Sequence, residues 1–110
     1  MTRMDFDSPR ILKLLKAIKG QYVLDWQGIH GISHWARVWE NGMRLAAVTG
    51  AKPEVVGYFA LFHDSRRFNE GNDHNHGRRG AELAAQWRGE LFDLDDESFD
   101  WLYTACVHHT

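Results

Sequence analysis

Apolar residues recur at helical spacing along most of this chain, and no stretch alternates apolar and polar residues as a half-buried strand does. From Ile11 to Ile18 the apolar residues fall at positions i, i+3, i+4 and i+7. The same period predicts further helices over about 33–49, 54–64 and 76–88, and a last one that carries Phe99 to Cys106. The pattern therefore predicts an all-α fold of about five helices.

Residues that typically begin and end helices support these boundaries. We expect the Ser8 hydroxyl to cap the first helix, with Pro9 in its first turn and Gly20 at its end. Gly50 should close the second helix, and Asp95 or Asp96 should cap the fifth. The segment 66–75 has no period and is rich in turn formers, so it is predicted to be a loop.

Composition bounds the class of protein. A chain of 110 residues with 44% hydrophobic residues is enough for one domain over 1–110, and nothing in it resembles a linker. The net charge of −2 argues against a nucleic-acid partner. Its single cysteine, Cys106, fits a reducing compartment, and no apolar run reaches the ~20 residues of a membrane span. We expect a cytoplasmic domain without a membrane partner.

Histidines are the unusual component, since there are seven and most lie on predicted apolar stripes. Such histidines occur on four predicted helices: His34, His63, His76, His108 and His109. A single buried histidine is usually a core residue, but several imidazoles cannot all be buried without partners. A metal ion satisfies many of them at once, so the sequence predicts a metal site.

His63 is followed directly by Asp64. Adjacent side chains on a helix point roughly 100° apart, so both can serve one site only at a helix end. A carboxylate there can bridge two cations about 3.5–4 Å apart. Imidazole and carboxylate donors suit Mn, Fe, Co, Ni or Zn, and one or two such divalent ions are expected.

Four segments, in order along the chain, resemble the HD superfamily of metal-dependent phosphohydrolases. HWARV (34–38) is similar to the family's H-x-x-R-V, and ALFHDSRR (60–67) is similar to its A-L-L-H-D signature. HGRRGAEL (76–83) and HHT (108–110) resemble elements of the two-metal branch that includes the HD-GYP phosphodiesterases. The resemblance implies an all-α, HD-domain-like bundle.

The resemblance also implies site residues. His34, His63 and Asp64 would be the core metal ligands, with Asp64 as the bridging and catalytic carboxylate. His76, His108 and His109 would complete the shell of the second metal. His30 is either an additional ligand or only a turn residue between two glycines, and His74 is expected to be solvated.

The implied activity is hydrolysis of a phosphomonoester or phosphodiester in a small, nucleotide-like substrate. Four arginines beside the ligands would clamp the phosphate, or would serve only as solvated surface residues: Arg66, Arg67, Arg78 and Arg79. Where many relatives read H-D-I-G-K this chain reads HDSRR, which places Arg67 at the lysine position.

The family pattern continues to an Asp ligand on a later helix, whereas this sequence stops at Thr110. The resemblance therefore predicts a C-terminally incomplete domain, weak as an enzyme in this short form, whose uncovered core favours a homo-oligomer. The alternative function is a non-catalytic, degenerate HD module that binds a metal or a nucleotide.

Overall fold

The computed structural model describes residues 5–109, and these form five α-helices. In chain order the helices are α1 (Pro9–Gln21), α2 (Ile32–Thr49), α3 (Pro53–Phe62), α4 (His76–Trp87) and α5 (Asp96–His108). The described part contains only one isolated β-bridge, between Arg88 and Phe92. The predicted all-α class is confirmed. Thr110, the last residue of the HHT motif, lies outside the described residues.

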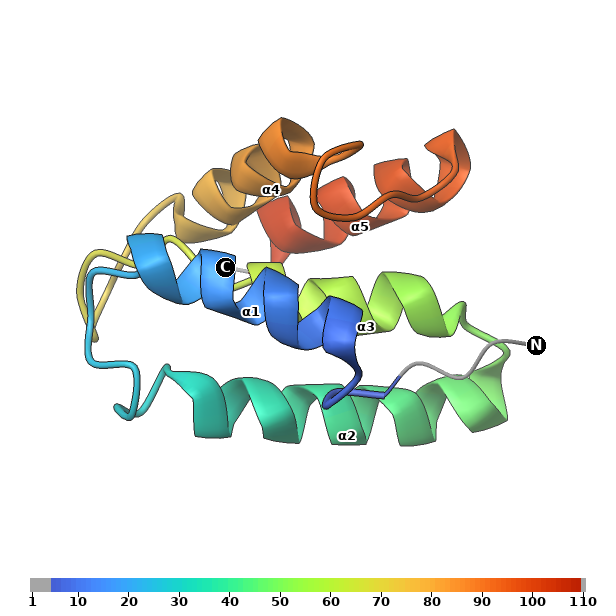
Figure 1. Ribbon diagram of the computed structural model, residues 1–110, viewed down its shortest axis with the longest axis horizontal. Helices are drawn as coiled ribbons and strands as arrows, with labels where there is room; N and C mark the ends of the chain where they lie inside the picture. Colours follow the sequence, from blue (N-terminus) through green and yellow to red (C-terminus); the bar gives the residue numbers. More distant parts are fainter. Residues whose placement is uncertain (1–4, 110) are drawn as a thin grey trace.

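Helix α3 lies in the middle of the molecule (Figure 1). It packs against α2 on one side and against the α4–α5 pair on the other, while α1 crosses in front in the view of Figure 1. Helices α2 to α5 alternate in direction along the chain. The N-terminal ends of α2 and α4 and the C-terminal ends of α3 and α5 therefore meet at one end of the bundle.

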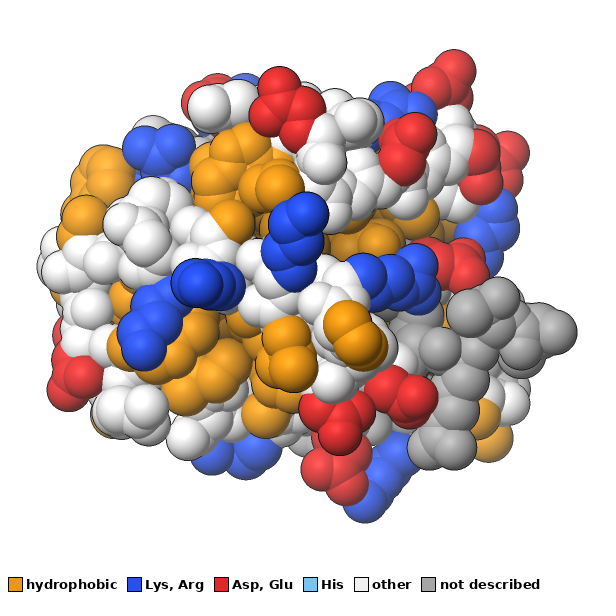
Figure 2. Space-filling view, in the orientation of Figure 1, with side chains coloured by type: hydrophobic (Ala, Val, Ile, Leu, Met, Phe, Trp, Pro, Cys, Tyr) orange, Lys and Arg blue, Asp and Glu red, His pale blue; other side chains and the backbone are white. Residues whose placement is uncertain are grey.

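The core is built from one apolar face of each helix. Ile18, Trp35, Phe62 and Leu102 are fully buried, and burial of such side chains contributes about 1.5–3 kcal/mol each. The lysines of α1 are exposed, and Figure 2 shows Lys and Arg side chains across the middle of the face where α1 lies. Among the described residues, no helix combines the length and apolar character that crossing a membrane requires.

The helix ends agree with the sequence in part. Gly50 closes α2 with a positive φ of 80°, and Asp95 caps α5 by accepting a hydrogen bond from the Ser98 N–H at 2.8 Å. Two expectations were wrong. Helix α1 does not end at Gly20 but includes this glycine and continues to Gln21. Ser8 occupies the N-cap position, but its hydroxyl makes no capping hydrogen bond.

Helix α3 is shorter than predicted. It ends at Phe62 instead of continuing to Asp64, and His63 is its C-cap residue. The backbone turns at this point, with the Ser65 N–H and the Arg67 N–H donating to the carbonyls of Phe62 and Asp64. His63 and Asp64 therefore stand at a helix end, the one place where neighbouring side chains can serve a single site.

Candidate metal centre

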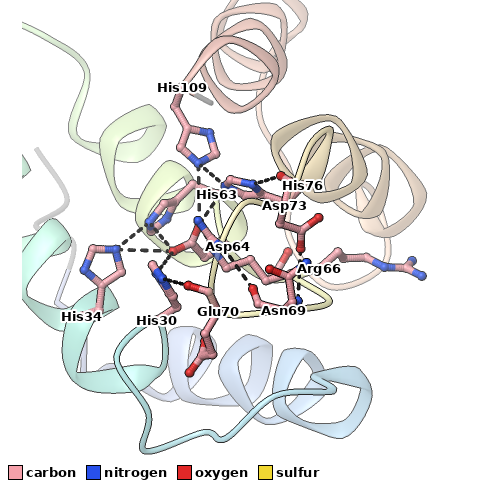
Figure 3. A network of polar contacts seen from close by, with 12 residues as sticks. His30, His34, His63, Asp64, Arg66, Asn69, Glu70, Asp73, His76 and His109 are labelled. Carbon is pink, nitrogen blue, oxygen red and sulfur yellow. Dashed lines mark hydrogen bonds and ion pairs between the residues drawn. The ribbon is translucent and has the colours of Figure 1, made fainter.

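The meeting of four helix ends gathers histidines around Asp64, as Figure 3 shows. His34 lies in the first turn of α2, His63 caps α3, His76 begins α4 and His109 caps α5. Asp64 is 3% exposed and His63 is 4% exposed, so the centre is buried at its base. The alternating direction of the helices is thus what converts distant histidines into one cluster.

One oxygen of Asp64 faces a first group, which consists of His30, His34 and His63. Oδ2 lies 3.5 Å from His30 Nδ1, 3.4 Å from His34 Nε2 and 3.5 Å from His63 Nε2. The Nε2 atoms of His34 and His63 are 3.3 Å apart. The ligand atoms of His30, His34 and Asp64 all lie within 4.8 Å of one another, and His63 approaches His34 and Asp64 beside them.

The other oxygen of Asp64 faces a second group, which consists of His76 and His109. Oδ1 lies 3.2 Å from His76 Nε2 and 3.6 Å from His109 Nε2, and these two nitrogens are 3.1 Å apart. Arg67 also approaches this oxygen, with its Nε at 3.3 Å. The carboxylate therefore has a separate set of neighbours on each of its oxygens.

Backbone carbonyls determine which imidazole nitrogens carry protons in the second group. A carbonyl can only accept, so His76 Nδ1 donates to Asp73 O and His109 Nδ1 donates to Cys106 O, each at 2.7 Å. With Nδ1 as the donor, the neutral form of each ring turns the lone pair of its Nε2 toward the other ring and toward Asp64 Oδ1. Lone pairs facing at 3.1 Å repel unless a proton or a metal cation lies between them.

The first group follows the same rule. His63 Nδ1 donates to the carbonyl of Ala60 at 2.9 Å, which leaves Nε2 as the free acceptor. His30 Nε2 donates to Glu70 O at 3.2 Å, and His30 Nδ1 is buried without a hydrogen-bond partner while it faces Asp64. Metal-ligating histidines typically donate their second ring N–H to a backbone carbonyl in this way.

The protonation states suit a cation. Burial lowers the pKa of His63 to about 4, and burial also lowers the pKa of His34 and of His76. Burial alone would raise the pKa of Asp64, but a hydrogen bond from His109, the charge of Arg67 and the protonated forms that His63 and His76 adopt in acid hold it well below its usual value. At neutral pH these rings are neutral and the carboxylate is ionised, the forms that bind metals.

The distances between the donor atoms also fit a bound cation. Two donors at about 2.1 Å from one ion, at roughly 90–110° to each other, lie about 3.0–3.4 Å apart. The donor separations around Asp64 are 3.1–3.6 Å. Both sets could hold a metal ion: His30, His34 and Asp64 in one case, and Asp64, His76 and His109 in the other.

The loop 66–75 borders the centre and fixes ligands in both groups. Its carbonyls at Glu70 and Asp73 accept from His30 and His76, respectively. The Asp73 carboxylate accepts from the backbone N–H of Phe68 and pairs with Arg79. The irregular loop predicted from the sequence is therefore internally braced at this edge.

The structure separates the four predicted phosphate-binding arginines. Arg79 stabilises the loop. Its Nε donates to the carbonyl of Arg66 and its Nη1 to that of His74, while its guanidinium stacks on the ring of Phe68. Arg78 is exposed, and the Arg66 side chain makes no hydrogen bond through its buried Nε. Arg67 alone of the four contacts Asp64.

His108 is placed differently from the prediction. It is exposed and belongs to neither group, whereas its neighbour His109 contacts Asp64. The helix face that leads to His108 is not a buried stripe, since Trp101, seven residues earlier, is 53% exposed. Both residues stand at the end of α5, but only His109 turns its imidazole toward Asp64. His74 is exposed, as expected.

His30, which the sequence left open, joins the first group. Its carbonyl accepts hydrogen bonds from Trp35 Nε1 at 2.8 Å and from Tyr22 Oη at 3.1 Å, which anchors the turn before α2. The sequence feature that could have indicated its place in the site is its position four residues before His34.

Two glycines, which the sequence did not single out as part of the site, bring α4 close enough. A Cβ at Gly77 would lie 2.0 Å from Cys106 O, and one at Gly80 would lie 2.2 Å from Phe62 O. These contacts place the first turn of α4 directly against α5 and α3. The sequence feature that could have indicated this close packing is a pair of glycines three residues apart on a predicted helix, immediately after the candidate ligand His76.

A pocket of about 370 Å³ lies beside the second group, lined by Arg67 and residues 71–76. It therefore opens next to the candidate ligand His76.

Comparisons with protein-family models, with curated proteins and with solved structures find no match for this chain. What the site can do is accordingly read from its own geometry, a buried carboxylate shared between two sets of imidazoles.

Proposed function

We propose that this protein is a metal-dependent phosphohydrolase that acts on a small phosphorylated molecule, of nucleotide-like chemistry, as a phosphomonoesterase or a phosphodiesterase. One observation carries the proposal: each oxygen of Asp64 faces its own set of imidazole nitrogens, His30, His34 and His63 on one side and His76 and His109 on the other. A carboxylate with two such sets of neighbours is suited to bridge two cations.

The resemblance to the HD superfamily supports the same reading. The HDSRR segment supplies His63 and Asp64 at the end of α3, and the other motifs supply His34, His76 and His109. Such an imidazole-rich set with one carboxylate suits Mn, Fe, Co, Ni or Zn. When bound, these ions would activate a water molecule and neutralise charge on the phosphoryl oxygens.

The residues of the chain would provide binding and orientation. Asp64 and the histidines would hold the cations in fixed positions, because backbone carbonyls orient the rings of His30, His63, His76 and His109. The adjacent pocket has the volume of a small-molecule site, and Arg67 supplies a positive charge in it. A small anionic substrate would therefore meet the metal centre at the second group.

The second candidate function is a metal- or nucleotide-binding module without turnover. It is favoured by the composition of the candidate metal sets, in which Asp64 is the shared carboxylate and every other donor found among residues 5–109 is an imidazole. Neutral ligands leave a divalent cation with more of its charge than a carboxylate-rich site does. Such a centre would bind cations more weakly and turn over more slowly.

The test is metal analysis of the purified protein together with hydrolysis of p-nitrophenyl phosphate, bis-p-nitrophenyl phosphate and common nucleotides. We expect bound transition metal and metal-dependent release of phosphate or of a monoester. The matched variants are His109→Ala and His108→Ala, neighbours of which only the first contacts Asp64.

The hydrolase proposal requires His109→Ala to lose activity and His108→Ala to keep it. Metal binding without turnover on any of these substrates would select the binding module. Absence of bound metal after incubation with Mn²⁺, Co²⁺ or Zn²⁺ would contradict the hydrolase and the metal-binding module, and would leave only a nucleotide-binding module.

A further inference from the structure

The second group already contains a positive charge of the protein itself. The Arg67 side chain is only 11% exposed, and its Nε lies 3.3 Å from Asp64 Oδ1. This is the oxygen that faces His76 and His109. The following inference rests on the proposed metal centre and concerns how its second half is filled.

The contact between Arg67 and Asp64 is an ion pair without hydrogen-bond geometry, since the buried Nε has no hydrogen-bond partner. The hydrogen bonds of this guanidinium are made with the loop 66–75 instead. Its Nη1 donates to the carbonyls of Asn69 and Gly71, both at 3.1 Å. Arg67 is therefore held by the loop, and only its charge holds it to the carboxylate.

A divalent cation on Oδ1 would lie within a few ångströms of the guanidinium. Like charges at such distances repel strongly in a buried site, so cation binding in the second group is weakened while Arg67 remains there. The repulsion is weaker in the first group, because three imidazoles surround Oδ2 while Arg67 Nε approaches Oδ1.

The pocket offers the guanidinium another partner. Arg67 and His76 both line it, and the one carboxylate among its lining residues, Asp73, is already paired with Arg79 and with backbone N–H groups. An anion in this pocket would therefore find Arg67 as its counter-charge. Arginine is well suited to bind a phosphate-type anion through two parallel hydrogen bonds.

We propose that Arg67 acts as a built-in cation that keeps the second group weak until a phosphate-type anion binds in the pocket. The guanidinium then pairs with the anion, and Asp64 Oδ1 becomes free for the second metal ion. The first group fills without the anion. Because such coupling is reciprocal, the second metal ion strengthens anion binding by the same factor.

The direct test counts Mn²⁺ bound to the wild-type protein by equilibrium dialysis, with free Mn²⁺ measured by electron paramagnetic resonance, with and without methylphosphonate. We expect one tight site in its absence and a second site that methylphosphonate strengthens roughly 10–100-fold. Titration of methylphosphonate at saturating Mn²⁺ should show the same factor. Two sites of equal affinity without methylphosphonate, or a second site that ignores it, would overturn the proposal.

Variants separate the charge of Arg67 from its structural contacts. Arg67→Met should bind the second Mn²⁺ without methylphosphonate, Arg67→Lys should keep the coupling in part, and Arg44→Met should behave as wild type, since Arg44 pairs with Glu40 on the exposed side of α2. If Arg67→Met does not fold, as judged by circular dichroism, the wild-type titrations decide. Wild-type protein that binds no Mn²⁺ at all would instead contradict the metal centre itself.

Discussion

The two histidine groups share one carboxylate and differ in what else they contain. The first group has three imidazoles, from α2, from the turn before it and from the end of α3. The second has two imidazoles, from α4 and α5, and the guanidinium of Arg67. The same convergence of helix ends has therefore produced two candidate cation sites with different local charge.

Each group depends on contacts that hold its own helix in place. The turn that carries His30 is anchored by hydrogen bonds from Trp35 and Tyr22. In the second group, α4 is held by direct contact of backbone on backbone at Gly77. The turn before α2 has such a contact as well, since a Cβ at Gly31 would lie 2.0 Å from Trp26 O. A packing change at one of these glycines should therefore disturb the group that its own helix carries.

Removal of the shared carboxylate charge should have the largest effect. Asp64→Asn keeps the shape of the side chain but removes the charge that both groups need, so we expect Mn²⁺ affinity to fall by roughly 100-fold or more in each. The measurement is equilibrium dialysis with and without methylphosphonate, with circular dichroism as the control for helix content. An Asp64→Asn protein that still binds one Mn²⁺ at wild-type affinity would show that the first group does not depend on Asp64.

Acid should destabilise the metal-free protein through His63, a member of the first group whose ring centroid lies 5.2 Å from that of His109 in the second. Burial lowers its folded-state pKa from 6.5 to about 4, so between these values the unfolded chain holds a proton that the folded protein does not. The free energy of unfolding should therefore fall as pH drops from about 6.5 to 4, by up to ~3 kcal/mol, and should not change on this account above pH 6.5.

Urea denaturation at pH 7.5 and at pH 4.5 measures this loss. His63→Asn is the control, because its amide can replace the hydrogen bond to Ala60 but does not titrate. Its stability should depend less on pH in this window. An equal loss in wild type and variant would assign the acid sensitivity to other groups.

Single-ligand variants should show that the two groups fill in order. His34→Ala should weaken the tight Mn²⁺ site roughly 10–100-fold, since it removes one donor of the first group. His76→Ala should leave that site intact and should abolish the additional site seen with methylphosphonate. The reverse pattern, with His76→Ala losing the tight site, would exchange the roles of the two groups.

Packing of α4 should affect the second group alone, and this effect is the smallest. Gly77→Ala places a Cβ 2.0 Å from Cys106 O and should cost roughly 1–2 kcal/mol of stability while it weakens the methylphosphonate-dependent site. Gly20→Ala is the matched control, since nothing lies within 4 Å and the helical position should gain about 0.5–1 kcal/mol. Thermal denaturation measures both. Loss of the tight site in Gly77→Ala would show that the groups are not mechanically separate.

Much of the fold, and the histidines of the candidate site, could be predicted from patterns between residues close together in the sequence. The period of the apolar residues determined five helices, and the glycine at position 50 and the aspartate at position 95 marked ends where the structure has them. The histidines of the centre stood out because imidazoles on apolar stripes need partners. His109 and His108 could not be told apart, since they are neighbours and only the direction in which α5 ends selects one of them.

The sequence by itself determined which residues are available: the helices, their apolar faces, the histidines and the His63–Asp64 pair. Only the tertiary structure decided which oxygen of Asp64 each imidazole faces, that His30 belongs to the site, and that Arg67 lies on the carboxylate while Arg79 braces the loop. The physical reason is that periodicity is a property of neighbours along the chain. The charge of a site depends instead on the few ångströms between groups that folding brings together from distant helices.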